Sequence, residues 1–382
     1  MKIESRITPQ RFYSLDVLRG LASLSVVLWH WQHFFYQGTK STLFDVSKQP
    51  FYSVFYLFYH KGALAVDLFF ALSGFVFFWL YASNIFLKQV NAFRFFVYRF
   101  SRLYPLHFIT LILVLIGQVV AMKIIGNFIV YPNNDLYNFI LNIFFISNWG
   151  FETDFSFNGP IWSVSVEVML YIVFFIFSYL GFTRKFWFCI LVIFGCTYIP
   201  NMPDMLVRGF FSFFVGGLVY LFYKKTGQNI KLPFIYFICI ITTLLWVFTF
   251  YSISSNYQIT ISSEIQWIDY IVQVILKYFA TAVLFPLTIF SLVIAETYKG
   301  SLGKRISIIG DLTYSMYLLH FPLQMIFIFI FYAFSLPKDY FFNEWLLVLF
   351  IIILFLASYF SFVKVEKPLQ KFLRIKILKN KV

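Results

Sequence analysis

Long runs of apolar residues follow one another along the chain, and most are close to the twenty residues that a membrane-spanning helix needs. The pattern predicts about ten such helices, at approximately 14–36, 62–84, 104–123, 159–180, 185–202, 206–223, 232–251, 271–295, 306–334 and 345–364. A further apolar stretch at 137–148 is too short to span comfortably, so it is expected to be interfacial or re-entrant. The sequence therefore predicts an all-α membrane protein: one membrane-embedded domain over residues 1–382, with its spans between about 14 and 364.

Composition supports this class, because 61% of the residues are hydrophobic, 24% are aromatic and only 12% are charged. The net charge of +14 raises the question of nucleic acid, but the lysines and arginines concentrate in alternate connections between the predicted helices. Basic residues favour the cytoplasmic side of a membrane, so both termini and their short basic tails are expected in the cytoplasm. No nucleic-acid partner is needed to explain the charge.

The first predicted helix carries Arg19 and His30 in an otherwise apolar stretch. Their spacing makes about three helical turns, which puts both side chains on one face, roughly 16 Å apart along the axis. Ionisable groups inside a span usually face the protein interior and mark a pathway or a reaction site. A guanidinium suits a phosphate or carboxylate, and an imidazole can exchange a proton near neutral pH. The alternative is that Arg19 pairs with Asp16 and that His30 is a hydrogen-bonded packing residue.

The fourth predicted helix carries a polar band in GPIWSVSVEVMLY, made of Trp162, Ser163, Glu167 and Tyr171. Glu167 lies about 12 Å inside the outer end of this helix, a depth expected to be similar to that of His30. A carboxyl group buried at that depth is costly unless it is used or paired.

Other polar residues in or near the spans have both functional and structural interpretations. Arg94, Arg99 and Arg102 precede the third predicted helix, where they could grip phosphates or anchor the chain on anionic lipid. Asp67 could cap a helix or pair locally, and the small residues Ser73 and Gly74 offer a surface that lets two helices approach each other.

The remaining histidines and one lysine complete the set of candidates. His320 lies in GDLTYSMYLLH, in the ninth predicted helix. Three other histidines are expected to be interfacial: His33, His60 and His107. Lys277 also falls inside a predicted span.

In this order, the motifs resemble those of the acyltransferase-3 family of bacterial membrane acyltransferases. The resemblance covers residues 12 to about 370 and rests on Arg19 with His30, VDLFFALSGF, RFSRLYP, GPIWSVSVEVMLY, GDLTYSMYLLH and VEKPL. It implies a multi-pass protein of the bacterial inner membrane that moves an acyl group, commonly acetyl from acetyl-CoA, onto a hydroxyl of an envelope or exported polysaccharide. An extracytoplasmic SGNH-type domain occurs in some members and is not expected here, so a partner would handle acyl groups on the outer side.

The resemblance also suggests site residues. His30 would be the catalytic base and Glu167 would orient it or bind the acceptor. The donor would be held by Arg19, Arg94, Arg99 and Arg102. The acceptor glycan, free or lipid-linked, would contact Trp162, Ser163, Tyr171, Asp67 and His320. No metal is expected, and a covalent relay through Ser163 ranks below direct transfer.

Two other classes of function fit a buried set of charges. A carrier or flippase for a lipid-linked sugar or small metabolite would line its path with them. A structural or sensory membrane protein would use them only to fix helix packing. The sequence leaves open the acceptor, the acyl group and the oligomeric state.

Overall fold

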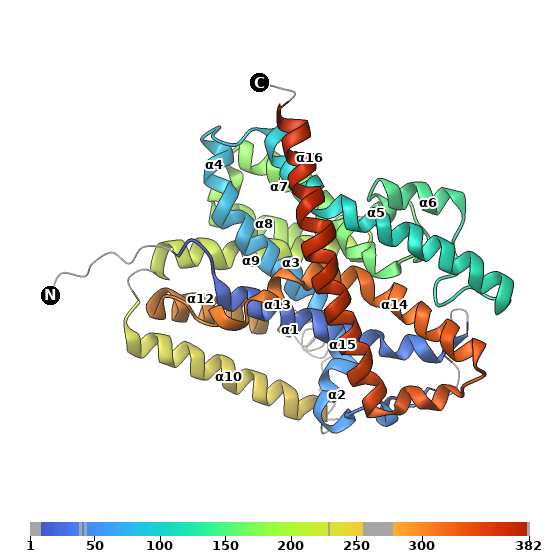
Figure 1. Cartoon of the computed structure of the whole chain (residues 1–382). Helices are drawn as coiled ribbons and strands as arrows, with labels where there is room; N and C mark the ends of the chain where they lie inside the picture. The colour runs from blue at the N-terminus through green and yellow to red at the C-terminus, as the bar shows by residue number, and fades with distance from the viewer. Residues whose placement is uncertain (1–8, 38–39, 42–43, 228–229, 255–277, 380–382) are drawn as a thin grey trace.

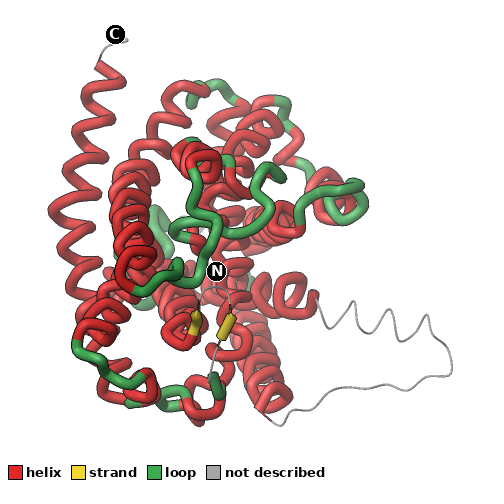
Figure 2. The backbone as a smooth tube through the Cα atoms, turned by 90° about the vertical axis from the view of Figure 1, so that its right-hand side faces the viewer, coloured by secondary structure: helices red, strands yellow, loops and turns green. Residues whose placement is uncertain are grey.

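The computed structural model describes residues 9–37, 40–41, 44–227, 230–254 and 278–379, so Lys277 lies outside the described residues. Most of the described chain is helical, and the rest consists of connecting loops and one pair of short antiparallel strands, β1 (Tyr36–Gln37) and β2 (Lys40–Ser41) (Figure 2). The α-helices are α1 (Tyr13–Trp29), α2 (Tyr52–Lys61), α3 (Ala65–Phe77), α4 (Ser83–Phe86), α5 (Ala92–Ile124), α6 (Leu136–Ile143), α7 (Trp162–Tyr179), α8 (Phe186–Gly195), α9 (Asp204–Thr226), α10 (Leu232–Ser254), α12 (Phe285–Lys299), α13 (Ile308–Asp311), α14 (Thr313–Ala333), α15 (Glu344–Ser361) and α16 (Lys367–Lys379).

Short segments of tighter or wider helix join or extend these elements. The 3₁₀ segments are η1 (His30–Phe35), η2 (Val46–Lys48), η3 (Gly62–Leu64), η5 (Ser147–Trp149), η6 (Gly159–Ile161), η7 (Phe182–Arg184), η10 (Lys304–Ile306) and η11 (Lys338–Phe342). The π-helical segments are η4 (Phe78–Ala82), η9 (Ala280–Leu284) and η12 (Phe362–Glu366).

The described residues contain eight helical runs that are long and apolar enough to cross a membrane, where the sequence pattern predicts about ten. Two predicted spans are shorter than expected. The first is an α-helix only to Trp29 before it tightens into η1, and the fifth, α8, ends at Gly195. The third begins at Ala92 rather than at 104, because Pro105 is accommodated inside α5. The all-α membrane class is confirmed; the expected side of each terminus stays a prediction.

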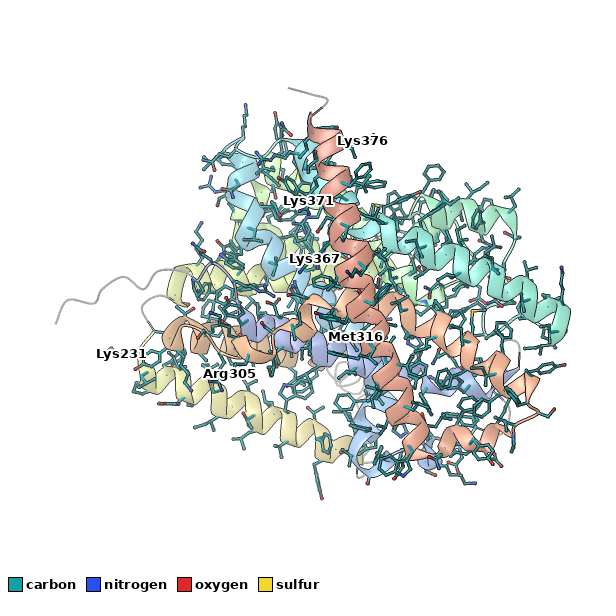
Figure 3. All side chains as sticks on the ribbon, viewed as in Figure 1. Lys231, Arg305, Met316, Lys367, Lys371 and Lys376 are labelled. Carbon is teal, nitrogen blue, oxygen red and sulfur yellow. The ribbon has the colours of Figure 1, made fainter. Side chains whose placement is uncertain are left out.

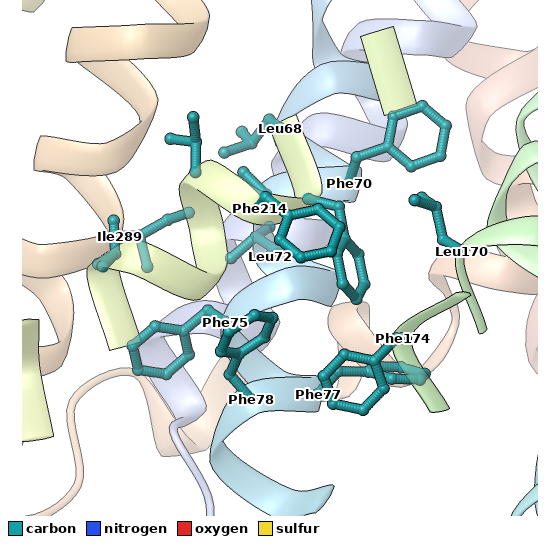
Figure 4. Close-up of a cluster of buried hydrophobic side chains, with 14 of the residues drawn as sticks. Leu68, Phe70, Leu72, Phe75, Phe77, Phe78, Leu170, Phe174, Phe214 and Ile289 are labelled. Atoms are coloured by element: carbon teal, nitrogen blue, oxygen red, sulfur yellow. The ribbon is translucent and has the colours of Figure 1, made fainter. Parts of the chain in front are cut away.

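Two glycines bring α3 and α9 into backbone contact at the centre of the bundle. A Cβ on Gly74 would lie 1.9 Å from the Phe213 carbonyl oxygen, and one on Gly216 would lie 1.9 Å from the Ala71 carbonyl oxygen. Small residues permit this approach between membrane helices, as the Ser73–Gly74 pair predicted. Around the contact, buried aromatic and aliphatic side chains of α3, α7, α9 and α12 form the main core (Figure 4).

Helix α1 is held at its N-terminal end by charged partners from distant segments. The buried carboxylate of Glu296 accepts hydrogen bonds from the backbone N–H groups of Tyr13 and Ser14, both at 2.9 Å. These N–H groups have no partner within the helix, and a negative charge at a helix N-terminus is stabilising. Arg11 also bridges Asp16 at 2.6 Å and Asp311 at 2.8 Å. The helix that carries Arg19 and His30 is therefore fixed in position.

The short helix α6 lies beside α5 (Figure 1). Just beyond its C-terminal end, the Phe145 ring packs 4.1 Å from the His107 ring, centroid to centroid, in the middle of α5. The Nε2 of His107 also donates to the Asn142 carbonyl at 2.8 Å. These contacts leave both alternatives for 137–148, interfacial or re-entrant, as predictions. His107 has no exposed surface, and its expected interfacial position also stays a prediction.

The basic C-terminal segment is helical rather than a loose tail. Helix α16 continues from α15 through η12 and packs against α5 (Figure 1). Figure 3 shows Lys367, Lys371 and Lys376 along it.

Candidate active site

Three histidines meet where α1 passes into η1. The His30 ring centroid lies 4.7 Å from that of His33 and 4.9 Å from that of His320. All three side chains are buried, and Gln324 of α14 donates to the His30 carbonyl at 2.8 Å. We call His30, His33 and His320 the histidine cluster. His33 is buried within the protein, with only 4% of its surface exposed, and its expected position at the membrane edge stays a prediction.

The backbone determines which nitrogen of His30 is free. Its Nδ1 lies 3.0 Å from the Val26 carbonyl oxygen, and a carbonyl can only accept, so Nδ1 carries the hydrogen. In the neutral ring, the lone pair is then on Nε2, which has no hydrogen-bond partner among the described residues. Within the described part of the chain, a neutral His30 therefore has an unpartnered lone pair on Nε2.

A second polar group lies on the Arg19 side of the bundle. We call Arg19, Arg99, Arg102 and Arg374 the arginine cluster. Arg99 is packed against the rings of Phe77 (4.5 Å) and Tyr81 (4.6 Å) and donates to the Tyr81 hydroxyl. Its buried Nε has no partner among the described residues. Arg374 of α16 donates to Ser101 at 3.1 Å.

The carboxylates near the arginine cluster are linked to it by charge. The charges of Arg102, Asp16 and Glu167 act on Arg19, and Arg102 also acts on Glu366 of the VEKPL motif. Glu366 accepts a hydrogen bond from Ser315. Two of the three π-helical segments, η4 with Tyr81 and η12 with Glu366, thus supply contacts here, and such segments are frequent at functional sites.

Glu167 is close enough to Arg19 for its charge to act on that residue. It accepts hydrogen bonds from Tyr171 at 2.6 Å and from Ser73 at 3.2 Å, and among the described residues none joins it to His30. The expected common depth of Glu167 and His30 stays a prediction. Among the described residues, no contact supports the idea that Glu167 orients the His30 ring.

A tyrosine connects the two groups. Tyr317 donates to the Pro160 carbonyl at 2.6 Å, so its oxygen accepts the hydrogen of Ser163 at 2.8 Å. The charges of Arg208 and Glu167 act on Tyr317, whose own carbonyl accepts from Nδ1 of His320 at 2.7 Å. We call Glu167, Tyr317 and Ser163 the polar line: hydrogen bonds join Ser163, Tyr317 and His320, whereas Glu167 acts on Tyr317 only through its charge. Ser163 has no contact with a histidine, which weighs against a covalent relay through it.

Two expected acceptor contacts have structural partners instead. Asp67, with a side chain 3% exposed, forms an ion pair with Arg208 at 2.7 Å that joins α3 to α9. The guanidinium of Arg208 lies 5.1 Å from the ring centroid of Trp162. Asp67 is therefore paired between two helices rather than locally in the sequence. The partner, Arg208, could not be identified from the sequence, because it lies 141 positions away.

The remaining expected residues lie as follows. Arg94 is exposed, and its guanidinium is 5.7 Å from the ring centroid of Tyr98, the ring that Arg374 contacts at 4.6 Å. Tyr171 and Arg99 line an apolar pocket of about 320 Å³ between α5, α7 and the end of α6.

His60 is exposed, in keeping with an interfacial position. Within the described residues, no group of three or more His, Cys, Asp or Glu side chains could hold a metal ion.

Comparison with known proteins identifies the class. The profile of the acyltransferase-3 family, described as an acyltransferase domain, matches residues 12–363. The chain belongs to this family of membrane acyltransferases.

One relative is named "Protein 2 in picA locus", from Rhizobium radiobacter. It is 32% identical over 136 residues, which are 36% of this chain and 59% of that protein. The chain therefore spans less than two thirds of that relative. No solved structure matches the chain.

Proposed function

We propose that this protein is an O-acyltransferase of the bacterial inner membrane that moves an acetyl group from acetyl-CoA to a hydroxyl of a cell-surface or exported polysaccharide. The observation that carries the proposal is the free Nε2 of His30, on the same helix as Arg19 and at the far end of a polar line from the arginine cluster. A base and an anion-binding group at opposite ends of one line suit a reaction between an anionic donor and a hydroxyl acceptor.

The arginine cluster, with Arg94 at its edge, is the proposed contact for the phosphates of the donor. Guanidinium groups bind phosphate through paired, charge-assisted hydrogen bonds. The unpartnered Nε of Arg99 and the exposed side chains of Arg94 and Arg102 leave donors available for such a ligand. The pantetheine arm then has to follow the polar line past Glu167 and Tyr317 toward His30.

The histidine cluster is the proposed place of the chemistry. A thioester already has an activated carbonyl, so the protein must mainly remove the hydroxyl proton and stabilise the developing charge. His30 takes that proton on Nε2. Among the residues expected to bind the acceptor, His320 lies in direct ring contact with His30, and Ser163 and Tyr171 lie along the line.

Membranes that contain the protein, supplied with radiolabelled acetyl-CoA and the envelope glycan of the source cells, test the proposal. Labelled glycan should form with the wild type and be lost in His30→Ala. His107→Gln is the matched control, because it changes a buried histidine in the middle of α5 and keeps a donor for the Asn142 carbonyl. Label that persists unchanged in folded His30→Ala would refute the assignment. Transport of an intact substrate without CoA would favour a carrier.

A further inference from the structure

His320 has the same arrangement as His30, although it lies on a different helix. Its Nδ1 lies 2.7 Å from the Tyr317 carbonyl oxygen, so Nδ1 carries a hydrogen in either charge state. Its Nε2 is buried and has no partner among the described residues. The two rings lie 4.9 Å apart with an interplanar angle of 34°. Two imidazoles, each held by a backbone carbonyl through Nδ1, thus keep both Nε2 atoms available.

A packing role alone does not account for this arrangement. A buried polar atom without a partner is unfavourable, and nearly all such atoms in folded proteins find one. Ring packing would be served equally well by an apolar side chain, as at the neighbouring Phe321, which is also fully buried. The free Nε2 of His320 therefore indicates a group that exchanges hydrogen with something that enters the site.

The surroundings give the three histidines different positions along the polar line. His320 adjoins Tyr317, on which the charges of Arg208 and Glu167 act, so it lies at the Tyr317 end of the polar line. His33 lies at the other side, with its ring centroid 5.4 Å from Tyr36 and 5.8 Å from Tyr131. Within the described residues, the ionisable groups in ring or electrostatic contact with His320 are His30, His33 and Tyr317. No carboxylate is among them.

We infer that His320 is a second catalytic histidine, whose Nε2 protonates the leaving thiolate of the acyl donor while Nε2 of His30 takes the proton of the acceptor hydroxyl. The inference rests on the proposed function. It divides between two side chains the acid and base tasks that one histidine otherwise performs in turn.

The proton and bond balance is complete with these two residues. The reaction begins with His30 neutral and His320 protonated on Nε2. The hydroxyl oxygen forms the new ester bond as its proton passes to His30, the carbon–sulfur bond breaks, and the sulfur takes the proton from His320. Transfer of the proton from His30 to His320 restores the starting state, so the acceptor proton ends on the free thiol. No oxidant or reductant takes part.

The decisive variant is His320→Asn, because the asparagine amide matches Nδ1 and can still donate to the Tyr317 carbonyl, whereas nothing replaces Nε2. The rate of thiol release from acetyl-CoA, with source-cell envelope glycan as acceptor, is measured from pH 5 to pH 9. The wild type should give a bell-shaped profile, since one histidine must be neutral and the other protonated. His320→Asn should be slower by about 10²–10⁴-fold and should lose the alkaline limb of the profile.

Controls separate this outcome from loss of folding and from failure of the proposed function. His107→Gln should keep both limbs. If His320→Asn does not accumulate in the membrane, His320→Gln is used, which also cannot carry the proton. A wild type without transferase activity would overturn the proposed function itself. An active wild type with a single-limbed profile, or a folded His320→Asn with both limbs and a loss below threefold, would overturn the inference alone.

Discussion

The arginine cluster and the histidine cluster are both polar groups inside an apolar bundle, but their side chains are satisfied in different ways. Around the arginine cluster, most groups have partners: Arg19 is 3.7 Å from Asp16, Arg374 donates to Ser101, and Glu167 accepts from Tyr171. In the histidine cluster, Nδ1 of His33 and Nε2 of His320 are buried without partners. Paired charges suit the binding of a charged ligand, and free lone pairs suit proton transfer. The comparison therefore supports the proposal that one region binds the donor and the other carries out the chemistry.

The largest effect is expected from His30→Ala, which removes the base. Its turnover should fall by about 10²–10⁴-fold with little change in the KM for acetyl-CoA, because the arginine cluster is untouched. Initial rates at several donor concentrations separate the two constants. A large rise in KM with near-normal turnover would reverse the assignment of the two regions.

Arg19→Gln should change mainly the KM for acetyl-CoA rather than the turnover. Loss of one charge-assisted hydrogen bond to phosphate costs about 1.5–3 kcal/mol, so the KM for the donor should rise roughly 10–100-fold with a smaller change in turnover. The control is Arg305→Gln, which removes an exposed arginine outside the cluster (Figure 3). Equal effects of the two substitutions would show that only the overall positive charge matters.

Gly74→Val tests whether the two regions depend on one scaffold. Its Cβ would clash with the Phe213 carbonyl, so α3 and α9 must separate, at a cost of about 1–3 kcal/mol in stability. Ser73 lies next to this contact and donates a hydrogen bond to Glu167. The KM for acetyl-CoA should therefore change more than the turnover of bound acetyl-CoA. Thermal unfolding in detergent gives the stability change. A variant as stable as the wild type would contradict the close packing.

The smallest effect is expected in the connection between α6 and α7, outside the spanning helices. Burial raises the pKa of Glu152 to about 7. The folded state then holds a proton that the unfolded segment releases near its ordinary pKa of 4.5. Local stability should therefore fall as the pH rises from about 4.5 to 7 and change little beyond that range. Hydrogen exchange of residues 147–158 at pH 5 and pH 8 measures the change, and Glu152→Gln should remove it.

Local patterns in the sequence predicted the all-helical class correctly, because it depends on spacing within single segments. The joint role of Arg19 and His30 stays a prediction. The position of His33 could not be predicted, because the chain changes from α-helix to 3₁₀ helix at His30. Residues three apart eclipse one another in a 3₁₀ helix, so His33 comes to lie against His30. No residue type marks that change in advance.

Long-range pairs were beyond the reach of a single sequence. Glu296 binds the start of α1 from 282 positions away, and Arg374 reaches Ser101 from 273 positions away. Arg374 was expected in a basic tail, and Glu296 was not recognised as a partner of the first helix. Such pairings depend on which helices become neighbours, and apolar patterns of similar strength do not specify that order.

Binding of acetyl-CoA to purified His30→Ala, measured by titration calorimetry beside the wild type, tests most directly whether binding and chemistry occupy separate regions. The division of the site predicts a Kd within about threefold of the wild-type value in a variant that no longer transfers the acyl group. Loss of donor binding together with activity would contradict that division, because it would place His30 in the binding of the donor.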